Sequence, residues 1–339
     1  MAKTVLLTGI SGYIGLHCAQ QLLESGYKVR GSVRSAAKEQ AVLDTLGTVS
    51  DKIEHLSFVR LDLSSDKGWD EAAMGCDYVL HVASPFVLAN PKTEDEMIKP
   101  AVNGTLLALK AAKHAGVKRV VLTSSMAAIM GNKKSGTMRP EDWADVSEPK
   151  MSTYFKSKTL AEKAAWEFVN AQTGDDKLEL TVINPGGVFG PPLGRDISGQ
   201  SMDMLSQMLG GKMPMVPDVA FPMVDVRDVA RLHVEAMTHP EANGLRIIAA
   251  SSEAHSFIEV AQILNDGGYK GPSTRKAPSF LLRIMSLFDR EAKGMVGILG
   301  MNVHADNSKT RALFDWKPIS FKDSVLASAE AVTEIIRGN

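Results

Sequence analysis

The residues best suited to do chemistry are a tyrosine and a lysine four positions apart, Tyr154 and Lys158. A helix predicted over Thr153 to Gln172 puts both side chains on one face, within reach of one bound molecule. Hydride addition to a carbonyl carbon leaves charge on the oxygen, which then needs a proton donor and a second hydrogen bond. Tyr154 is suited to donate the proton, and Ser125, at the end of a predicted strand, to hold the oxygen. The pattern therefore favours carbonyl reduction, with the Lys158 ammonium lowering the pKa of the Tyr154 phenol.

A glycine-rich loop near the start of the chain is suited to a dinucleotide. Gly9, Gly12 and Gly15 follow a predicted strand as G-x-x-G-x-x-G and open a predicted helix. Without side chains this backbone turns sharply and approaches a diphosphate closely, and the helix start offers free N–H groups and partial positive charge. The loop predicts dinucleotide binding through Gly9, Ser11, Gly12, Tyr13, Ile14 and Gly15.

The end of the next predicted strand favours NADP over NAD. Enzymes that use NAD often carry an acid there, which accepts a hydrogen bond from the ribose 2′-hydroxyl. This chain has Arg34 instead, with Lys38 one helical turn further on. Two cations without an acid at the strand end suit a 2′-phosphate. Asp62 and Leu63, which end the third predicted strand, are expected beside the adenine.

The elements that must position these residues alternate short β-branched runs with longer helical patterns. Strands are expected at Thr4 to Thr8, Lys28 to Val33, Ile53 to Leu61, Tyr78 to Ala83, Arg119 to Thr123 and Leu180 to Asn184, and helices at Tyr13 to Ser25, Ala36 to Leu46, Glu94 to His114 and Thr153 to Gln172. The alternation predicts an α/β fold: a doubly wound Rossmann sheet of parallel strands, with ligands at the carboxyl ends of the strands.

The regular alternation stops at Pro185, where proline and glycine cluster. Beyond it we expect helices at 226–238, 257–264, 279–288 and 321–337, and a strand at 245–249. We predict an NADP-binding domain over residues 1–185, to which about 224–250 return, and a smaller, interleaved C-terminal substrate lobe over 186–339. Six of the 17 methionines fall between Met202 and Met223, either as an adaptable surface near a ligand or as core filling.

Composition excludes several classes of protein. With 44% apolar residues, 23% charged residues and a net charge of -1, the chain is neither disordered nor a basic nucleic-acid binder. Cys18 and Cys76 form no C-x-x-C pair, so we expect no metal site and a cytoplasmic location. No apolar run is long enough to span a membrane. The expected partner is a small-molecule carbonyl substrate, and the expected assembly is a monomer or homodimer.

Further motifs stand at the predicted strand ends and on the helices: Thr8 to Gly15, His81 to Pro85, Thr123 to Ser125, Tyr154 to Glu162 and Asn184 to Pro191. From residue 4 to about 335, the chain resembles the extended short-chain dehydrogenase/reductases, and most closely their dihydroflavonol reductase-like branch. The resemblance implies NADPH-dependent carbonyl reduction by Ser125, Tyr154 and Lys158, with Asn103 helping to position the lysine through its backbone and water. It also implies cofactor contacts from Val82, Ala83, Ser84, Thr123, Tyr154, Lys158, Pro185, Gly187 and Val188.

The sequence departs from two subgroups of that branch. Ile129 stands where plant flavonoid enzymes carry a polar residue, and Thr153, Phe155 and Lys156 replace the cysteine-containing signature of the CoA-ester reductases. We therefore expect a small or medium aldehyde or ketone with an apolar flank. The expected pocket residues are Phe86, Ser125, Met126, Tyr154, Gly187 and Phe221.

Two other functions fit the same fold. A nucleotide-sugar epimerase or dehydratase would keep its cofactor bound, but a cofactor recycled in place is usually NAD, which Arg34 opposes. A non-catalytic regulator that senses NADP would not need Ser125, Tyr154 and Lys158 together. Turnover of NADPH with carbonyl compounds distinguishes these alternatives.

Overall fold

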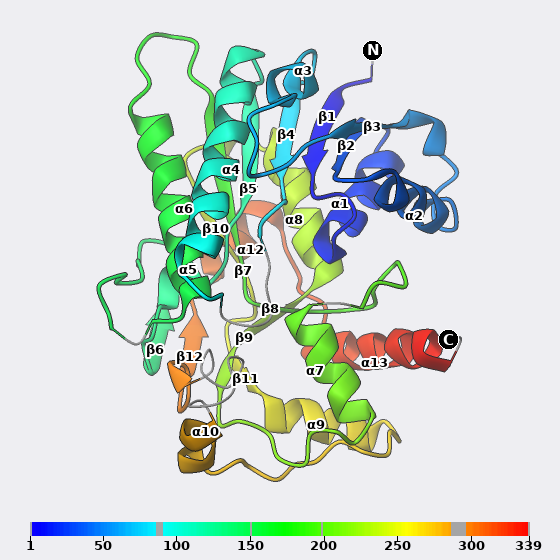
Figure 1. Cartoon of the computed structure of the whole chain (residues 1–339), viewed down its shortest axis with the longest axis vertical. Helices are drawn as coiled ribbons and strands as arrows, with labels where there is room; N and C mark the ends of the chain where they lie inside the picture. Colours follow the sequence, from blue (N-terminus) through cyan, green and yellow to red (C-terminus); the bar gives the residue numbers. More distant parts are fainter. Residues whose placement is uncertain (1, 86–90, 150, 198, 286–295, 338–339) are drawn as a thin grey trace.

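A parallel sheet of seven strands forms the centre of the computed structural model, which describes residues 2–85, 91–149, 151–197, 199–285 and 296–337 (Figure 1). The strands are β1 (Thr4–Thr8), β2 (Lys28–Val33), β3 (Leu56–Arg60), β4 (Tyr78–His81), β5 (Arg119–Thr123), β7 (Glu179–Pro185) and β10 (Arg246–Ala249). They lie in the order β10-β7-β5-β4-β1-β2-β3. This is the order of a doubly wound Rossmann sheet, so the predicted fold class is confirmed.

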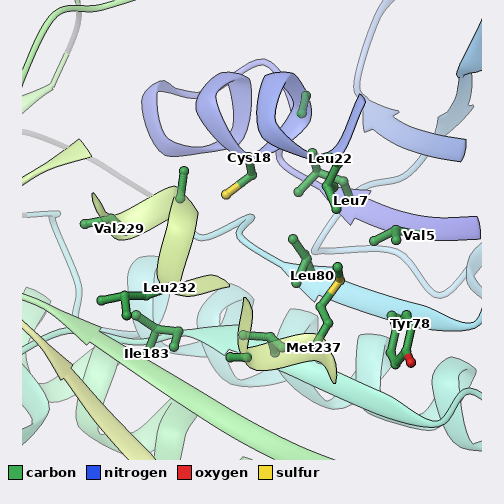
Figure 2. Close-up of a cluster of buried hydrophobic side chains, with 14 of the residues drawn as sticks. Val5, Leu7, Cys18, Leu22, Tyr78, Leu80, Ile183, Val229, Leu232 and Met237 are labelled. Carbon is green, nitrogen blue, oxygen red and sulfur yellow. The ribbon is translucent and has the colours of Figure 1, made fainter. Parts of the chain in front are cut away.

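Helices cover both faces of this sheet because successive strand residues point to opposite sides. Val5 and Leu7 contribute to a core with α1 (Tyr13–Glu24), α2 (Ala36–Leu46) and α8 (Val226–Thr238). Figure 2 shows this core, in which Cys18 of α1 and Leu232 of α8 lie near the strand residues Leu7, Leu80 and Ile183. Leu6 belongs to the opposite core, with α3 (Trp69–Ala73), α4 (Asp95–His114) and α6 (Thr153–Asn170).

The helix N-termini differ in a way that matters for the site. Ser35 caps α2, Ser152 caps α6 and Asp225 caps α8, each by accepting from a backbone N–H in the first turn. Helix α1 begins at Gly12 without a side-chain cap. The one of these four helices that follows the glycine loop therefore offers its first N–H groups to a ligand.

A second sheet and further helices form a smaller lobe, in the lower half of Figure 1. The strands are β11 (Ala254–Ser256), β9 (Ala220–Asp225), β12 (Asn302–Ala305) and β6 (Ser135–Met138), with β8 (Gly187–Phe189) paired to β9. Its helices are α7 (Gln200–Leu209), α9 (Phe257–Asp266), α10 (Ser279–Met285) and α13 (Phe321–Arg337). The short helix α5 (Ala127–Met130) follows β5, and α12 (Ser308–Phe314) contacts β10 of the large sheet. Two 3-10 turns, at Ile53–His55 and Pro240–Ala242, belong to the part around the large sheet.

The chain crosses between the sheet and the lobe more often than the sequence suggests. Helix α8 and strand β10 return to the large sheet, as the predicted segment 224–250 requires. In addition, β6 leaves the first 185 residues to pair with β12 in the small sheet. Phe314 and Trp316, near the end of the chain, pack into the core of α1 and α8. The cofactor part and the lobe therefore share their cores and their folding.

Local differences from the expected elements have simple causes. Strand β3 starts at Leu56 rather than Ile53, because Ile53–His55 form a 3-10 turn. The methionines between Met202 and Met223 were expected either to fill the core or to form an adaptable surface. Met202, Met208 and Met223 are buried in the core of the lobe, whereas Met215 is 37% exposed. Core filling therefore accounts for the most buried of these thioethers.

Candidate active site

The functional side chains collect at the carboxyl ends of β1, β4 and β5, where the strand order reverses between β1 and β4. In a doubly wound sheet, helices leave this point toward opposite faces, which opens a crevice for a ligand. The glycine loop lies on one side of this point, after β1. The Ser125 segment lies on the other side, after β5.

The glycine loop fits a dinucleotide because its backbone leaves no space for side chains. Gly9 has a φ of +70°, and a Cβ there would lie 2.8 Å from the backbone of Ala83. A Cβ on Gly15 would overlap the carbonyl oxygen of Gly9. Gly12 is exposed at the uncapped start of α1. Bare backbone at a free helix N-terminus is the donor set that a diphosphate needs.

Other residues of the predicted loop also make contacts within the protein. The Tyr13 hydroxyl donates to the carbonyl oxygen of Gly190 over 2.6 Å, and burial raises the pKa of this phenol well above its usual value. Ile14 packs against the core of α1. Ser11 is partly exposed beside Gly12. Tyr13 thereby connects the cofactor loop to the segment that follows β8.

The predicted 2′-phosphate contacts lie at the surface where β2 ends. Arg34 is exposed directly after β2, and Lys38 is exposed in the first turn of α2. The Lys38 Nζ atom forms a 3.0 Å ion pair with Asp196, which follows β8. Both cations therefore stand where the prediction needs them, and one of them is already paired with a carboxylate.

Three further predicted cofactor residues contact the protein itself. Leu63 packs against Gly104 of α4, where an added Cβ would lie 2.5 Å from its Cδ2 atom. The buried Thr123 hydroxyl is 2.7 Å from the Nε2 atom of His233. Asp62 is exposed and accepts from the backbone N–H of Ser64 over 2.7 Å.

The segment after β4 meets the glycine loop directly. The backbone N–H of Ala83 donates to the Thr8 hydroxyl over 3.2 Å, and its backbone lies against Gly9. Val82 packs against the core. His81 is buried and its Nδ1 atom lies 2.9 Å from the Thr8 hydroxyl, so it acts as a hydrogen-bond partner within the fold.

The predicted catalytic residues come together as the sequence pattern requires. The hydroxyl groups of Tyr154 and Ser125 are hydrogen-bonded to each other. Lys158 is 8% exposed, and its Nζ atom donates to the Ser84 hydroxyl over 2.9 Å. Helix α6 thus carries a phenol and an ammonium on one face, against a serine that follows β5.

The pKa shifts in this group differ in part from the expectation. Burial lowers the pKa of Lys158 to about 8, while the Glu162 carboxylate acts in the opposite direction. Burial raises the pKa of Tyr154, and only the hydrogen bond from Ser125 opposes that effect. The expected lowering of the phenol pKa by Lys158 is therefore not observed. The phenol is protonated at neutral pH, which is the state a proton donor needs.

The Asn103 side chain does not line the space beside Lys158, so a role for this residue through its backbone and water stays a prediction. Asn103 is exposed on α4, whereas Ala101 and Thr105 face the catalytic lysine. These two residues line a cavity of about 10 Å³ together with Lys158. Residues four apart share a helix face, and a residue between them lies on the opposite side. The small volume is close to that of one water molecule.

The residues predicted to bind substrate include Gly187 of β8 and Phe221 of β9, which lie close together. A Cβ on Gly187 would lie 2.7 Å from the Phe221 ring, so the glycine permits this close approach. Val188 of β8 packs on the large core, and Pro185 of β7 accepts from the Met126 N–H over 2.8 Å. Phe86, also predicted here, lies outside the described residues.

An apolar cluster extends the predicted pocket wall. Tyr154 and Phe221 are partly buried against a core that includes Met126. The sequence analysis did not identify three further partly buried members of this cluster, Phe257, Leu282 and Ile298. Ile129 is fully buried in the same cluster, so its apolar character reflects core packing rather than contact with substrate. The inference drawn from Ile129 about flavonoids is therefore unsupported.

The sequence analysis also missed a buried acid beside the catalytic residues. Glu162 follows Lys158 by four positions on α6 and is 1% exposed. Its carboxylate accepts from Ser124, Asn184 and Arg246. The sequence signal that could have identified Glu162 is its spacing: it follows Lys158 by four residues, as Lys158 follows Tyr154, and therefore lies on the same face of the helix.

In the part of the chain that the structure describes, no helix is long and apolar enough to cross a membrane. Over those same ranges, no group of three or more histidine, cysteine or acidic residues is arranged to hold a metal ion.

Comparison with known proteins adds to the geometry. The profile of the NAD dependent epimerase/dehydratase family matches residues 5–249. The NADPH-dependent methylglyoxal reductase GRE2 of Saccharomyces cerevisiae is 33% identical over 285 residues, covering 78% of this chain and 82% of that protein. The cinnamoyl-CoA reductase CAD2 of Medicago truncatula is 35% identical and covers 78% and 81%, respectively.

The similarity extends to three-dimensional structure. The crystal structure of yeast methylglyoxal/isovaleraldehyde reductase Gre2 complexed with NADPH matches with a TM-score of 0.80 and 28% identity. The match covers 99% of both chains. The full path of this chain, lobe included, therefore follows that of a solved reductase.

Proposed function

Because this chain belongs to the NAD dependent epimerase/dehydratase family, we propose that it is an NADPH-dependent carbonyl reductase, which converts aldehydes or ketones to alcohols. The observation that carries the proposal is the Tyr154–Ser125 hydrogen bond beside the buried ammonium of Lys158. A proton donor, a holder for the oxygen and a positive charge are the three groups that carbonyl reduction needs from the protein.

The side chains divide the work of the reaction. When bound, NADPH supplies the hydride that the carbonyl carbon accepts. Tyr154 donates its proton to the carbonyl oxygen, and burial keeps that proton on the phenol until it is needed. Ser125 binds the same oxygen and fixes its position. Lys158 stabilises the phenolate that remains after proton transfer.

The cofactor is held by groups of two kinds. The bare backbone of Gly9 to Gly15 binds the diphosphate at the start of α1, and Arg34 and Lys38 bind the 2′-phosphate. Val82, Ala83 and Ser84 line the crevice after β4, and Lys158 holds the ribose. Asp62, Pro185, Gly187 and Val188 complete the crevice, whereas Leu63 and Thr123 support it through their packing.

The substrate is a small or medium carbonyl compound with an apolar flank. Gly187 and Phe221 lie beside Tyr154, the buried Met126 supports them from the same core, and the wall is extended by partly buried apolar side chains. A polyhydroxylated ligand would leave buried polar groups unpaired against such a wall, at a cost of about 1 to 3 kcal/mol each. Apolar walls bind by area and tolerate differences in shape, so the range of substrates is broad.

We further infer that residues 1–185 and the returning segment of about 224–250 form the cofactor part, and that the rest of 186–339 forms the interleaved substrate lobe. The monomer or homodimer and the cytoplasmic location stay predictions. Cys18 and Cys76, both free and buried thiols, suit a reducing compartment.

The experiment that tests the function measures NADPH oxidation by the purified chain. The panel contains aryl aldehydes, alkyl ketones, a dihydroflavonol and a hydroxycinnamoyl-CoA. We expect turnover across the aldehydes and ketones, and a kcat lower by about 10²-fold or more with Tyr154→Phe. A lead of about a thousandfold in kcat/KM for either of the last two compounds would overturn the substrate class. NADPH binding without any turnover would indicate a sensor instead.

A further inference from the structure

The helix that carries the catalytic tyrosine and lysine carries a third functional group on the same face. Tyr154, Lys158 and Glu162 are spaced by four residues along α6. The Glu162 side chain is fully shielded from solvent, and Lys158 is nearly so. A carboxylate in such a place is stable only when donors surround it.

The donors to Glu162 come from three strands and from its own helix. Its Oε2 atom accepts from the Ser124 hydroxyl over 2.5 Å and from the Asn184 amide over 2.8 Å. Its Oε1 atom accepts from Arg246 over 2.5 Å and from Trp166 over 3.3 Å. The carboxylate therefore ties α6 to the ends of β5 and β7 and to β10.

These contacts reach the catalytic serine through its backbone. The same Asn184 amide donates to the Ser125 carbonyl oxygen over 3.1 Å. Ser124, bound to the carboxylate directly, is the neighbour of Ser125 in the chain. The Glu162 carboxylate thus fixes the segment that holds the Ser125 hydroxyl relative to the helix that holds the Tyr154 hydroxyl.

The carboxylate also acts on the charge of Lys158. It opposes the effect of burial on the pKa of that ammonium. The other groups near Lys158 supply no negative charge. Tyr154 is protonated, Ser84 is neutral, and the two α4 residues that line the cavity, Ala101 and Thr105, are uncharged. His81, on the β4 side, is also neutral because burial lowers its pKa to about 3.

Stability alone does not explain this buried charge. Replacing a buried ion pair by apolar residues is often neutral or stabilising, because desolvation offsets the attraction. The Arg246 guanidinium also donates to the carbonyl oxygens of Pro140 and Asp142 and stacks on the Trp143 ring, and among the described residues only its Nη2 atom is buried without a hydrogen-bond partner. A buried charge that stability does not require, placed beside catalytic groups, is more simply explained by what it does for them.

We propose that Glu162 is a positioning residue for the reaction of the proposed reductase: its carboxylate aligns Ser125 with Tyr154 and keeps the Lys158 ammonium charged. This role of Glu162 rests on the proposed function, but different experiments test the role and the function. Activity of the wild-type chain toward carbonyl compounds tests the function. The pH behaviour of Glu162 variants tests the inference.

The first experiment compares Glu162→Gln with a matched control, Glu179→Gln. Glu179 pairs with Arg119 where β5 and β7 begin, whereas Glu162 binds residues where these two strands end. The control therefore removes one negative charge from another arginine-paired acid, far from the catalytic residues. We measure kcat/KM against pH for both variants, and the dissociation constant of NADPH against pH as a readout independent of turnover.

Glu162→Gln removes the anion that favours protonated Lys158. We expect the alkaline limb of kcat/KM, and the weakening of NADPH binding at high pH, to move to lower pH by about one unit. We also expect kcat to fall by about ten- to a hundredfold because Ser125 is no longer aligned. Glu179→Gln should lower thermal stability and leave both pH profiles in place.

A second variant keeps the inference testable if the glutamine variant does not fold. Glu162→Asp retains the charge but shortens the side chain by one methylene. We expect a reduced kcat with the alkaline limb close to that of the wild type. The inference is overturned if neither Glu162 variant changes kcat or the pH profile more than Glu179→Gln does, or if Glu162→Asp shifts the limb to lower pH.

Discussion

The ion pair between Lys38 and Asp196 leads to a prediction about cofactor affinity. The Lys38 ammonium is one of the two cations placed for the 2′-phosphate, yet it already contacts the Asp196 carboxylate at 3.0 Å. A bound 2′-phosphate must compete with that carboxylate and is repelled by it. Asp196→Asn keeps the size of the side chain and removes its charge, so NADPH should bind more tightly to the variant.

The exposure of the pair sets the size of the effect. The two side chains are 46% and 47% exposed, so the interaction is screened by water and salt. Pairs of this kind contribute about 0 to 1 kcal/mol. We therefore expect the dissociation constant of NADPH to fall by about two- to fivefold at low salt, and by less at high salt. NADH lacks the phosphate and should bind with unchanged affinity.

Calorimetric titration with NADPH and NADH at two salt concentrations measures these changes. Glu235→Gln is the control, because it removes an acid from a half-exposed pair with Arg231 on α8. Arg34→Asp should act in the opposite direction and weaken NADPH binding by about ten- to a hundredfold, since a charge-assisted contact is replaced by repulsion. The reasoning fails if Asp196→Asn tightens both cofactors equally, or if the wild type prefers NADH.

Three further predictions concern the catalytic groups and the glycine loop. Tyr154→Phe removes the proton donor without changing its partly buried ring, so kcat should fall by about 10²-fold or more while NADPH affinity stays unchanged; near-normal turnover would exclude Tyr154 as the donor. Because the pKa of Lys158 is about 8 and its charged form is the active one, kcat/KM should decrease as the pH rises above about 8, and a profile flat to pH 10 (about the pKa of a free phenol) would contradict this role. Gly15→Ala should abolish NADPH binding, as seen in calorimetry, because the added Cβ overlaps the Gly9 carbonyl oxygen; unchanged affinity would show that the loop adapts.

The cofactor half of the site was predictable because its signals are local. The loop from Gly9 to Gly15 has a fixed spacing between a strand and a helix, and β1, β2 and α2 have the predicted bounds. A backbone that must approach both a ligand and a neighbouring strand requires glycine at set positions. The Tyr154 and Lys158 pair was equally local, since one helix turn brings the two residues together.

The direction of a single side chain on a helix was the hardest feature to predict. The resemblance gives Asn103 a role through its backbone and water, but it does not tell which side chains of α4 lie beside Lys158: Asn103 is exposed, and Ala101 and Thr105 line the cavity. A shift of two residues turns a side chain to the other side of a helix. The inference from Ile129 lacks support for a related reason. From the sequence alone, an apolar residue after the catalytic serine can belong either to a pocket wall or to the core, and Ile129 is buried in the core.

Glu162 shows why spacing alone could not complete the site. An acid on an amphipathic helix is ordinarily a solvated residue, and nothing within its own helix predicts otherwise. Its burial depends on donors that lie 38, 22 and 84 residues away, in Ser124, Asn184 and Arg246. Those donors meet only after β5, β7 and β10 have paired in one sheet. The charge beside Lys158 is therefore a product of the complete fold, so a substitution at Arg246 in the returning segment should reach the catalytic lysine without touching it.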